Sequence, residues 1–282
     1  MRHLELFAGI GGFRRAMDLL TQDHIMDFHC IGYSEIDAKA VKTYCANYHP
    51  EVDGELAMGD IVEFTSNKNN MDNLPQFDLV TGGFPCQTFS MMGKQAGFNE
   101  DRGQMFFHII DILAAKMPRY VLLENVKNLK SHDKGRTFAR IKQELEALGY
   151  QVFTDIFNTA QFHLPQTRNR LLIFATTEPV PADFEVQFTC DNIAVVFDQV
   201  YQDFGTYHYQ SVNDILSLEV DKKYFLSEKI KPTLLADGSA NFKSKSDINM
   251  SIARPLTATM HKMHRACQDN YYSQDFIESH GT

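Results

Sequence analysis

The sequence predicts an α/β fold, a doubly wound and mostly parallel sheet followed by a smaller irregular region. Short apolar segments alternate with amphipathic segments of helical spacing through residues 1–176, and the connections between them are short. This pattern is typical of parallel strands joined by helical crossovers. After residue 176 the alternation fades, and aromatic residues mix with lysines and small polar residues. We therefore expect two domains, residues 1–176 and 177–282.

Each element of the first domain is predicted from its own segment. Apolar runs predict strands at residues 4–7, 28–34, 56–61, 77–81, 120–123, 151–157 and 171–176. Apolar residues at helical spacing predict helices at residues 13–20, 37–47, 105–115 and 137–148. Ligands of such sheets bind at the carboxyl ends of the strands, so the residues that directly follow a strand are the candidates for a functional site.

Composition excludes several classes of protein. The 282 residues are 44% hydrophobic and 22% charged, which is typical of a globular chain. No apolar run approaches the roughly 18 residues that cross a bilayer, and Glu5 interrupts any signal-peptide core. The five cysteines never form a C-x-x-C pair. We therefore expect no disulfide framework, no metal and a reducing cytoplasm.

Charge is distributed unevenly along the chain. The formal net charge is −9, but between Lys222 and Arg265 nine basic residues accompany only three acidic ones. This segment has a net charge of +6, which leaves −15 for the remainder. A basic segment on an acidic body indicates a surface that meets a polyanion. A solvated, lysine-rich surface is the alternative interpretation.

A glycine-rich turn (FAGIGGF, residues 7–13) lies between the first predicted strand and helix. Glycines there permit positive φ and let a ligand approach the backbone closely, although the spacing is not G-x-G-x-x-G. Glu35 ends the second strand, where an acid can bind the ribose hydroxyls of a nucleoside cofactor. Asp60 ends the third strand and could accept from an adenine amino group. A tight turn followed by surface acids is the alternative.

A rigid loop (GGFPCQTFS, residues 82–90) follows the fourth predicted strand and carries Cys86. A free cysteine is more often buried and inert. Inert cysteines need no loop built from two glycines and a proline, so we interpret Cys86 as a nucleophile at the carboxyl edge of the sheet.

Glu124 directly follows the fifth strand, on the same edge as Cys86. Partial desolvation there would raise the pKa of the carboxyl and let it donate a proton; a helix cap or a surface acid is the alternative. Arg168 and Arg170 alternate at the start of the last strand, so both side chains should share one face. A cation there could lower the pKa of the thiol and bind an oxygen acceptor.

Together these motifs resemble those of the C5-cytosine-specific DNA methyltransferases of bacterial restriction–modification systems. The glycine turn resembles the cofactor loop of that family, with Glu35 as its ribose acid and residues 59–61 as its adenine contact. Residues 85–87 (PCQ), 124–126 (ENV) and 166–170 (QTRNR) resemble its catalytic loop, acid motif and arginine motif, and residues 93–103 its mobile stretch. Six motifs in the family's order make the resemblance specific.

The resemblance implies the Rossmann-like fold of S-adenosylmethionine-dependent methyltransferases and assigns residues to roles. The implied catalytic residues are Cys86, Glu124, Arg168 and Arg170. The implied contacts to S-adenosyl-L-methionine are Phe7, Gly9, Ile10, Gly11, Gly12, Glu35, Ile36, Asp60, Ile61, Pro85 and Met105. The implied DNA contacts are Gln87, Ser90, Lys94, Lys262 and Arg265. No metal is implied.

The implied reaction moves a methyl group to C5 of a cytosine that is flipped out of a specific duplex sequence. Cys86 would bond to C6 as a covalent nucleophile, Glu124 would carry a proton near N3, and Arg170 would hold the O2 oxygen. S-adenosyl-L-homocysteine would be the second product. An RNA cytosine-5 methyltransferase, or a non-catalytic subunit that binds S-adenosylmethionine or DNA, is the alternative.

The sequence departs from the family after the recognition region begins. The family continues with an Arg/Leu-rich motif and a final glycine–asparagine helix, and neither is recognisable here. We expect a split enzyme completed by a second polypeptide, or a truncated chain, in preference to a complete compact variant. The expected partner is double-stranded DNA, read by the segment around residues 260–272, with a loop packed on its own domain as the alternative. The expected location is the bacterial cytoplasm, on DNA and away from membranes.

Overall fold

The computed structural model describes residues 1–85, 105–204, 209, 211–237, 246–256, 264–265 and 267–280. The chain divides into two compact units. The first comprises Met1–Ile156 and Arg170–Thr189, and the second comprises Phe157–Asn169 and Cys190–Thr282. These units are defined by the packing of the chain. The boundary at residue 176 was predicted between a catalytic domain and a recognition region, and it stays a prediction.

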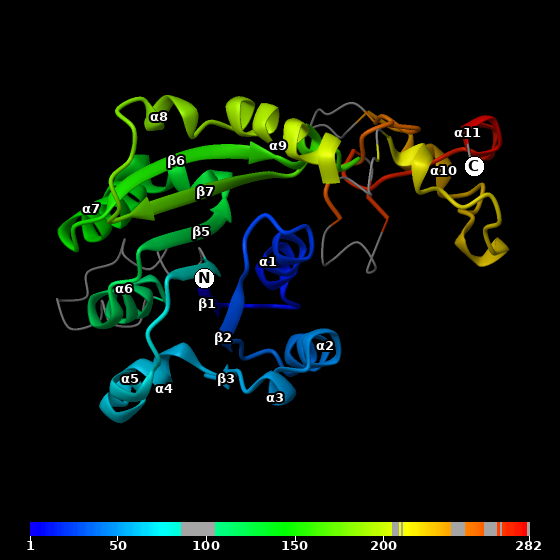
Figure 1. Cartoon of the computed structure of the whole chain (residues 1–282). Helices are drawn as coiled ribbons and strands as arrows, with labels where there is room; N and C mark the ends of the chain where they lie inside the picture. The colour runs from blue at the N-terminus through cyan, green and yellow to red at the C-terminus, as the bar shows by residue number, and fades with distance from the viewer. Residues whose placement is uncertain are drawn as a thin grey trace. The chain divides into compact units, whose positions relative to one another are not determined.

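A seven-stranded sheet runs through the described residues in the order β3-β2-β1-β4-β5-β7-β6 (Figure 1). The pairs β1–β2, β2–β3, β1–β4 and β4–β5 are parallel, and β5–β7 is antiparallel. The strands are β1 (Arg2–Leu6), β2 (His29–Ser34), β3 (Leu56–Ala57), β4 (Leu79–Gly83), β5 (Tyr120–Val126), β6 (Gln151–Asn158) and β7 (Asn169–Thr176). The predicted mostly parallel sheet is therefore confirmed.

The helices cover both faces of the sheet, as a doubly wound fold requires. The crossover from β1 to β2 and the crossover from β4 to β5 run in opposite directions along the sheet. Because such crossovers are right-handed, α1 and α6 lie on opposite faces, as Figure 1 shows. The described helices are α1 (Gly12–Gln22), α2 (Ala38–Tyr48), α3 (Pro50–Asp53), α4 (Ile61–Ser66), α5 (Lys68–Asn73), α6 (Met105–Lys116), α7 (Arg136–Ala147), α8 (Phe184–Gln187), α9 (Cys190–Phe204), α10 (Lys231–Leu234) and α11 (Gln274–His280).

The reversal of winding falls between β1 and β4, which are neighbours in the sheet. In open α/β sheets the crevice for a ligand lies at this switch point, outside the carboxyl ends of the strands. The segments that follow β1 and β4 are the glycine turn and the Pro85–Cys86 loop. Topology therefore brings the two most informative motifs of the sequence to one edge.

Apolar residues of the strands and of α6 form the main core. Leu4 and Leu6 of β1 and Ile109 of α6 are fully buried within one continuous cluster. Full burial of such a side chain stabilises the fold by about 1.5–3 kcal/mol. A smaller cluster joins Ala8 and Tyr33 to Tyr44 of α2. The glycine turn thus lies next to a second, aromatic-rich cluster, which includes partly buried Tyr48.

Two of the differences between the structure and the sequence prediction have a clear physical reason. The strand expected at residues 56–61 covers only Leu56–Ala57, because the Asp60 carboxylate accepts a hydrogen bond from the Val62 amide and begins α4. The region after residue 176 contains a 15-residue helix, α9, that the sequence analysis did not predict. Its closely spaced aromatic and β-branched residues obscured the helical period.

The second unit holds its two chain segments together by backbone contacts. Gln166 and Ala253 form a parallel bridge, and the Thr167 amide donates to the Ala253 carbonyl at 2.8 Å. Within the described ranges, no helix combines the length and the apolar character of a membrane span. In the same ranges, no group of three His, Cys, Asp or Glu side chains is arranged to hold a metal ion.

Candidate functional site

The glycine turn after β1 has the backbone conformation that its sequence predicts. Gly9 has φ +58° and Gly11 has φ +89°, and even Phe7 has a positive φ of 53°. Only glycine adopts such angles without a steric cost. Gly11 is the N-cap of α1 and also has the left-handed conformation, so the helix begins directly at the turn.

A buried carboxylate supports the turn from below. Glu5 of β1 is 1% exposed and accepts hydrogen bonds from the amides of Phe13 and Arg14, both at 3.2 Å. Burial raises the pKa of Glu5 to about 8. The first strand is thereby connected directly to the first turn of α1, a role that the sequence analysis missed because Glu5 lies inside an apolar run.

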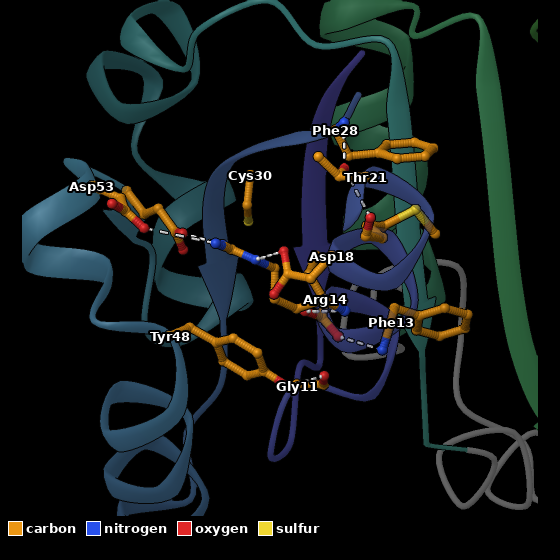
Figure 2. A network of polar contacts seen from close by, with 12 residues as sticks. Gly11, Phe13, Arg14, Asp18, Thr21, Phe28, Cys30, Tyr48 and Asp53 are labelled. Atoms are coloured by element: carbon orange, nitrogen blue, oxygen red, sulfur yellow. Dashed lines mark hydrogen bonds and ion pairs between the residues drawn. The ribbon is translucent and has the colours of Figure 1, made fainter. Parts of the chain in front are cut away.

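Arg14, on the first turn of α1, gathers acidic partners (Figure 2). Its Nε lies 2.9 Å from Asp18 Oδ1, its guanidinium pairs with Glu55, and its Nη2 lies 3.7 Å from Asp53 Oδ2. The Glu55 side chain is fully buried, so this pair fixes α1 against the segment that leads into β3.

Glu35 lies at the end of β2, where the sequence analysis placed it, and it contacts the glycine turn. Its Oε2 accepts from the Gly9 amide at 2.8 Å, and its Oε1 accepts from the amides of Ile36 and Asp37, each at 2.8 Å. The Ile36 side chain is 74% exposed and Ile10 of the turn is 61% exposed. Two apolar side chains therefore stand in solvent next to a carboxylate, an arrangement that suits a ligand with both an apolar ring and hydroxyls.

The side chains of Asp60 and Ile61 both make structural contacts. One Asp60 oxygen caps α4 through the Val62 amide at 2.8 Å. Ile61 is 2% exposed and belongs to the main core. The Ser34 hydroxyl donates to the Gly59 carbonyl at 2.8 Å and joins this segment to the end of β2.

The ends of β4 and β5 fit closely together. The two strands are in register, with Gly83 paired to Glu124. A Cβ on Gly83 would lie only 3.2 Å from the Glu124 Oε2 atom, so the glycine leaves room for the carboxylate. Asn125 is 3% exposed, and its side-chain amide donates to the Phe84 carbonyl at 2.8 Å. Asn125, which follows Glu124, thus holds Phe84, which lies two residues before Cys86.

Arg170 meets Glu124 across the antiparallel β5–β7 pair. Arg170 is paired with Val126 in register, so it is a diagonal neighbour of Glu124. Its Nε lies 2.5 Å from Glu124 Oε1, and each side chain is about one quarter exposed. The two residues therefore form a charge-assisted hydrogen bond at the edge that also carries the loop of Cys86.

The other predicted residues make contacts of their own or lie outside the described residues. Arg168 belongs to the second compact unit, and its amide donates to the Thr159 hydroxyl at 3.1 Å. Pro85 is exposed, and Met105 opens α6 and packs partly against the main core. The remaining ones lie outside the described residues: Cys86, Gln87, Ser90, Lys94 and Lys262.

Arg265, proposed from the sequence to contact DNA, has a carboxylate partner in the second unit. Its Nη2 lies 2.9 Å from Asp269 Oδ1, and its amide donates to the other oxygen at 3.0 Å. Asp269 is 7% exposed. This pair closes a turn, so Arg265 has a structural task in the basic segment.

The sheet order and its switch-point edge define the class of protein. The fold is shared with a methyltransferase of known structure: the crystal structure of S. pombe Dnmt2 methyltransferase superposes with a TM-score of 0.65 at 19% sequence identity, covering 95% of this chain and 74% of that chain. The chain belongs to the family described as C-5 cytosine-specific DNA methylase, whose profile matches residues 1–281.

Curated relatives agree with this family. The chain is 37% identical over 227 residues to the Type II methyltransferase M.NlaX of Neisseria lactamica, a match that covers 80% of this chain and 63% of the relative. It is 38% identical over 231 residues to M1.ScrFI of Lactococcus lactis subsp. cremoris, covering 80% and 51%. The chain thus spans about half to two thirds of the length of these relatives.

Proposed function

We propose that this chain transfers a methyl group from S-adenosylmethionine to C5 of a cytosine within a specific duplex DNA sequence. One observation carries the proposal. At the carboxyl ends of β4 and β5, the Glu124–Arg170 pair and the Asn125 contact to Phe84 gather at the start of the loop that bears Cys86. The family membership supports the same reaction.

The residues after β1 and β2 fit S-adenosylmethionine. A Cβ built on Gly9 or Gly12 would meet no atom within 4 Å, so the space beside the turn is open. The Glu35 carboxylate has about four acceptor positions, of which three are used by backbone amides. It can therefore also accept from a ribose hydroxyl, while exposed Ile36 offers an apolar contact to adenine. When bound, S-adenosylmethionine supplies an electrophilic methyl group on a sulfonium leaving group.

Three side chains would activate the cytosine. The Cys86 thiolate would form a bond to C6, the C5–C6 π electrons would move into a C4–C5 double bond, and the C4–N3 π electrons would move onto N3. Glu124, in its protonated form, would give its proton to N3. The guanidinium of Arg170 has five N–H donors, so its pairing with Glu124 is compatible with a contact to the O2 oxygen. After C5 has taken the methyl group, loss of the C5 proton to a water molecule and departure of the Cys86 thiolate would restore the C5–C6 double bond, and N3 would return its proton to Glu124.

The cytosine must leave the helix before Cys86 can reach it. A base inside a duplex is inaccessible, so the proposal includes base flipping. The basic segment 222–265, with Lys262, and the loop residues Gln87, Ser90 and Lys94 are proposed as the DNA contacts. A bacterial cytoplasmic location on DNA is part of the same proposal.

Methyl transfer from labelled S-adenosylmethionine to a mixed duplex DNA pool tests the function, with transfer RNA as the competing substrate. Label in DNA, followed by sequencing of the modified positions, is the expected result. Label in RNA alone would support the RNA enzyme, and binding without transfer would support a non-catalytic subunit. Cys86→Ala should abolish transfer and the trapped adduct with 5-fluorocytosine DNA, whereas Cys45→Ala, on α2, should retain both. Full activity of Cys86→Ala would overturn the nucleophile assignment.

We also propose that a second polypeptide contributes to activity. The matched regions cover only 63% and 51% of two relatives, so parts of those proteins have no counterpart in the match. Assays of this chain with and without the product of the neighbouring reading frame test this. Full methylation by the chain alone would contradict the proposal.

A further inference from the structure

The glycine turn is fixed at both ends by side chains of one segment, residues 35–48. At its start, the Gly9 amide donates to Glu35 at 2.8 Å. At its end, the hydroxyl of Tyr48 donates to the Gly11 carbonyl at 2.7 Å. Figure 2 shows Tyr48 reaching Gly11 from the neighbouring helix. Glu35 lies three residues before α2 and Tyr48 is its last residue, so this helix and the residues before it hold the turn at both ends.

The Tyr48 ring lies close against Gly11. A Cβ at position 11 would lie 2.2 Å from Tyr48 Cε2 and 2.9 Å from Cζ. The Gly11 carbonyl also accepts the first helical hydrogen bond of α1, from the Arg15 amide at 2.9 Å. One carbonyl thus serves both the helix and the tyrosine, which determines where α1 begins relative to α2.

The ring itself is held by its neighbours. Tyr48 packs against Tyr44 with ring centroids 4.9 Å apart, and Tyr44 stacks on Tyr33 at 4.2 Å. The Arg14 guanidinium carbon lies 5.4 Å from the Tyr48 centroid, within range of a cation–π contact. Burial raises the pKa of Tyr48, so its hydroxyl keeps the proton that it donates. The hydrogen bond to Gly11 is therefore made by a preorganised group.

We propose that Tyr48 is a positioning residue that sets the affinity of the glycine turn for S-adenosylmethionine through its hydroxyl. This inference rests on the proposed function, in which the turn binds the cofactor. Glu35 contacts both the turn and, by proposal, the ribose. Tyr48 acts from the other end, through the Gly11 carbonyl and without a proposed cofactor contact. Loss of the hydroxyl would free one end of the turn, while the ring would keep the packing.

The experiment compares Tyr48→Phe with Tyr33→Phe in the full chain, together with any partner that activity requires. Tyr33 belongs to the same ring column, but its hydroxyl faces Cys45 Sγ at 3.6 Å and does not reach the turn. Calorimetry gives the Kd for S-adenosylmethionine, and kinetics separate its KM from kcat and from the KM for DNA. One neutral hydrogen bond corresponds to a change of about 3- to 10-fold. We expect Tyr48→Phe to raise Kd and KM for S-adenosylmethionine by that factor, with kcat and the KM for DNA nearly unchanged.

The outcomes separate this inference from the proposed function. Wild-type protein that fails to bind S-adenosylmethionine contradicts the proposed function. Wild-type binding with equal affinity in Tyr48→Phe contradicts the role of the hydroxyl, and an equal loss in Tyr33→Phe shows a general effect of the aromatic cluster. Thermal unfolding is measured for both variants, and Tyr48→Ala, which also removes the ring, should lose more affinity than Tyr48→Phe. If Tyr48→Phe and Tyr48→Ala lose the same affinity, the ring contributes nothing and the whole effect belongs to the hydroxyl, which supports the proposal.

Discussion

The side-chain amide of Asn125 donates a hydrogen bond to the carbonyl of Phe84 at 2.8 Å, in a position where Asn125 is 3% exposed. Its own Oδ1 accepts from the Val126 amide at 2.9 Å. Asn125 therefore joins the end of β5 to the residue that precedes Pro85. Because Phe84 directly precedes Pro85, a contact that holds Phe84 also holds the start of the loop that contains Cys86.

Asn125→Ala should lower kcat by about tenfold or more while leaving the KM for S-adenosylmethionine nearly unchanged. The variant leaves a buried carbonyl without this donor, at a cost of about 1–3 kcal/mol, and releases the start of the loop. Steady-state kinetics measure the effect. Asn128→Ala removes an exposed side chain three residues away and serves as the control. Unchanged kcat in Asn125→Ala would show that the loop is positioned by other contacts.

Glu124→Gln should reduce methyl transfer by about 100-fold or more, the usual contribution of a general acid, with little change in stability. In Glu124→Gln the side-chain oxygen can still accept a hydrogen bond from Arg170, and both side chains are about one quarter exposed to solvent, so the fold should lose little stability. Single-turnover kinetics and chemical denaturation measure the two quantities. Glu144→Gln breaks a comparable pair with Arg140 on α7, also at 2.5 Å, and should retain activity. Equal activity of both variants would remove Glu124 from the mechanism.

The contribution of Glu5 to stability should fall as pH rises from about 5 to 8. Burial raises the pKa of Glu5 to about 8, so between its unfolded and folded pKa values the folded state binds a proton that the unfolded state releases. This contribution is fully present below the unfolded pKa and is lost as pH rises through the folded pKa. Its slope is at most about 1.4 kcal/mol per pH unit.

Urea denaturation across this pH range measures the contribution of Glu5. Glu5→Gln, which keeps an oxygen for the amides of Phe13 and Arg14, should show a flatter dependence than the wild type. Parallel curves for the two proteins would show that Glu5 does not titrate in this range.

Gly11→Ala should both destabilise the fold and weaken binding of S-adenosylmethionine. The alanine would have to adopt φ +89°, and its Cβ would lie 2.2 Å from Tyr48 Cε2. Gly149→Ala is a matched control, because Gly149 has φ +90° and no atom lies within 4 Å of its Cβ position. The control measures the backbone cost alone, about 1–2 kcal/mol. The difference between the two variants in thermal unfolding and in Kd isolates the clash with Tyr48, and identical behaviour would contradict it.

DNA binding should weaken steeply with salt, because phosphate contacts release counterions. Lys262→Ala should reduce the slope of log K against log salt by about 1. Lys142→Ala removes a lysine that pairs with Glu146 on α7 and should leave the slope unchanged. Fluorescence anisotropy with a labelled duplex measures both. Binding that ignores salt would argue against the basic segment as a DNA surface.

Much of the fold could be predicted from the sequence because its strands are short and apolar and are followed by a glycine or an acidic residue. β1, β2, β5 and the helices α1, α2, α6 and α7 lie within a few residues of their predicted positions. The prediction of secondary structure was wrong where the contacts or the packing of side chains, and not the apolar period, determine the element. Asp60 ends a strand early by capping α4, and in α9 mixed aromatic and β-branched residues conceal a helix.

The candidate site was predictable where a sequence motif contains the reactive side chain itself. It was less predictable where a residue acts by positioning another residue. Glu35, Glu124 and Arg170 were identified from their places at strand ends. Asn125 was quoted within its motif without a role, and Tyr48 and Glu5 were not identified. Their tasks depend on contacts with residues 8 to 41 positions distant in the chain, and no local pattern reports such contacts.

The second compact unit is assembled from two separated stretches, residues 157–169 and 190–282, and the chain passes between the units at three points. An exchange of this unit between homologous genes is therefore more demanding than a single crossover. A chimaera joined only after residue 189 would combine a donor's later stretch with the recipient's residues 157–169, including the Gln166 bridge to Ala253. Natural or engineered swaps should succeed when both stretches travel together.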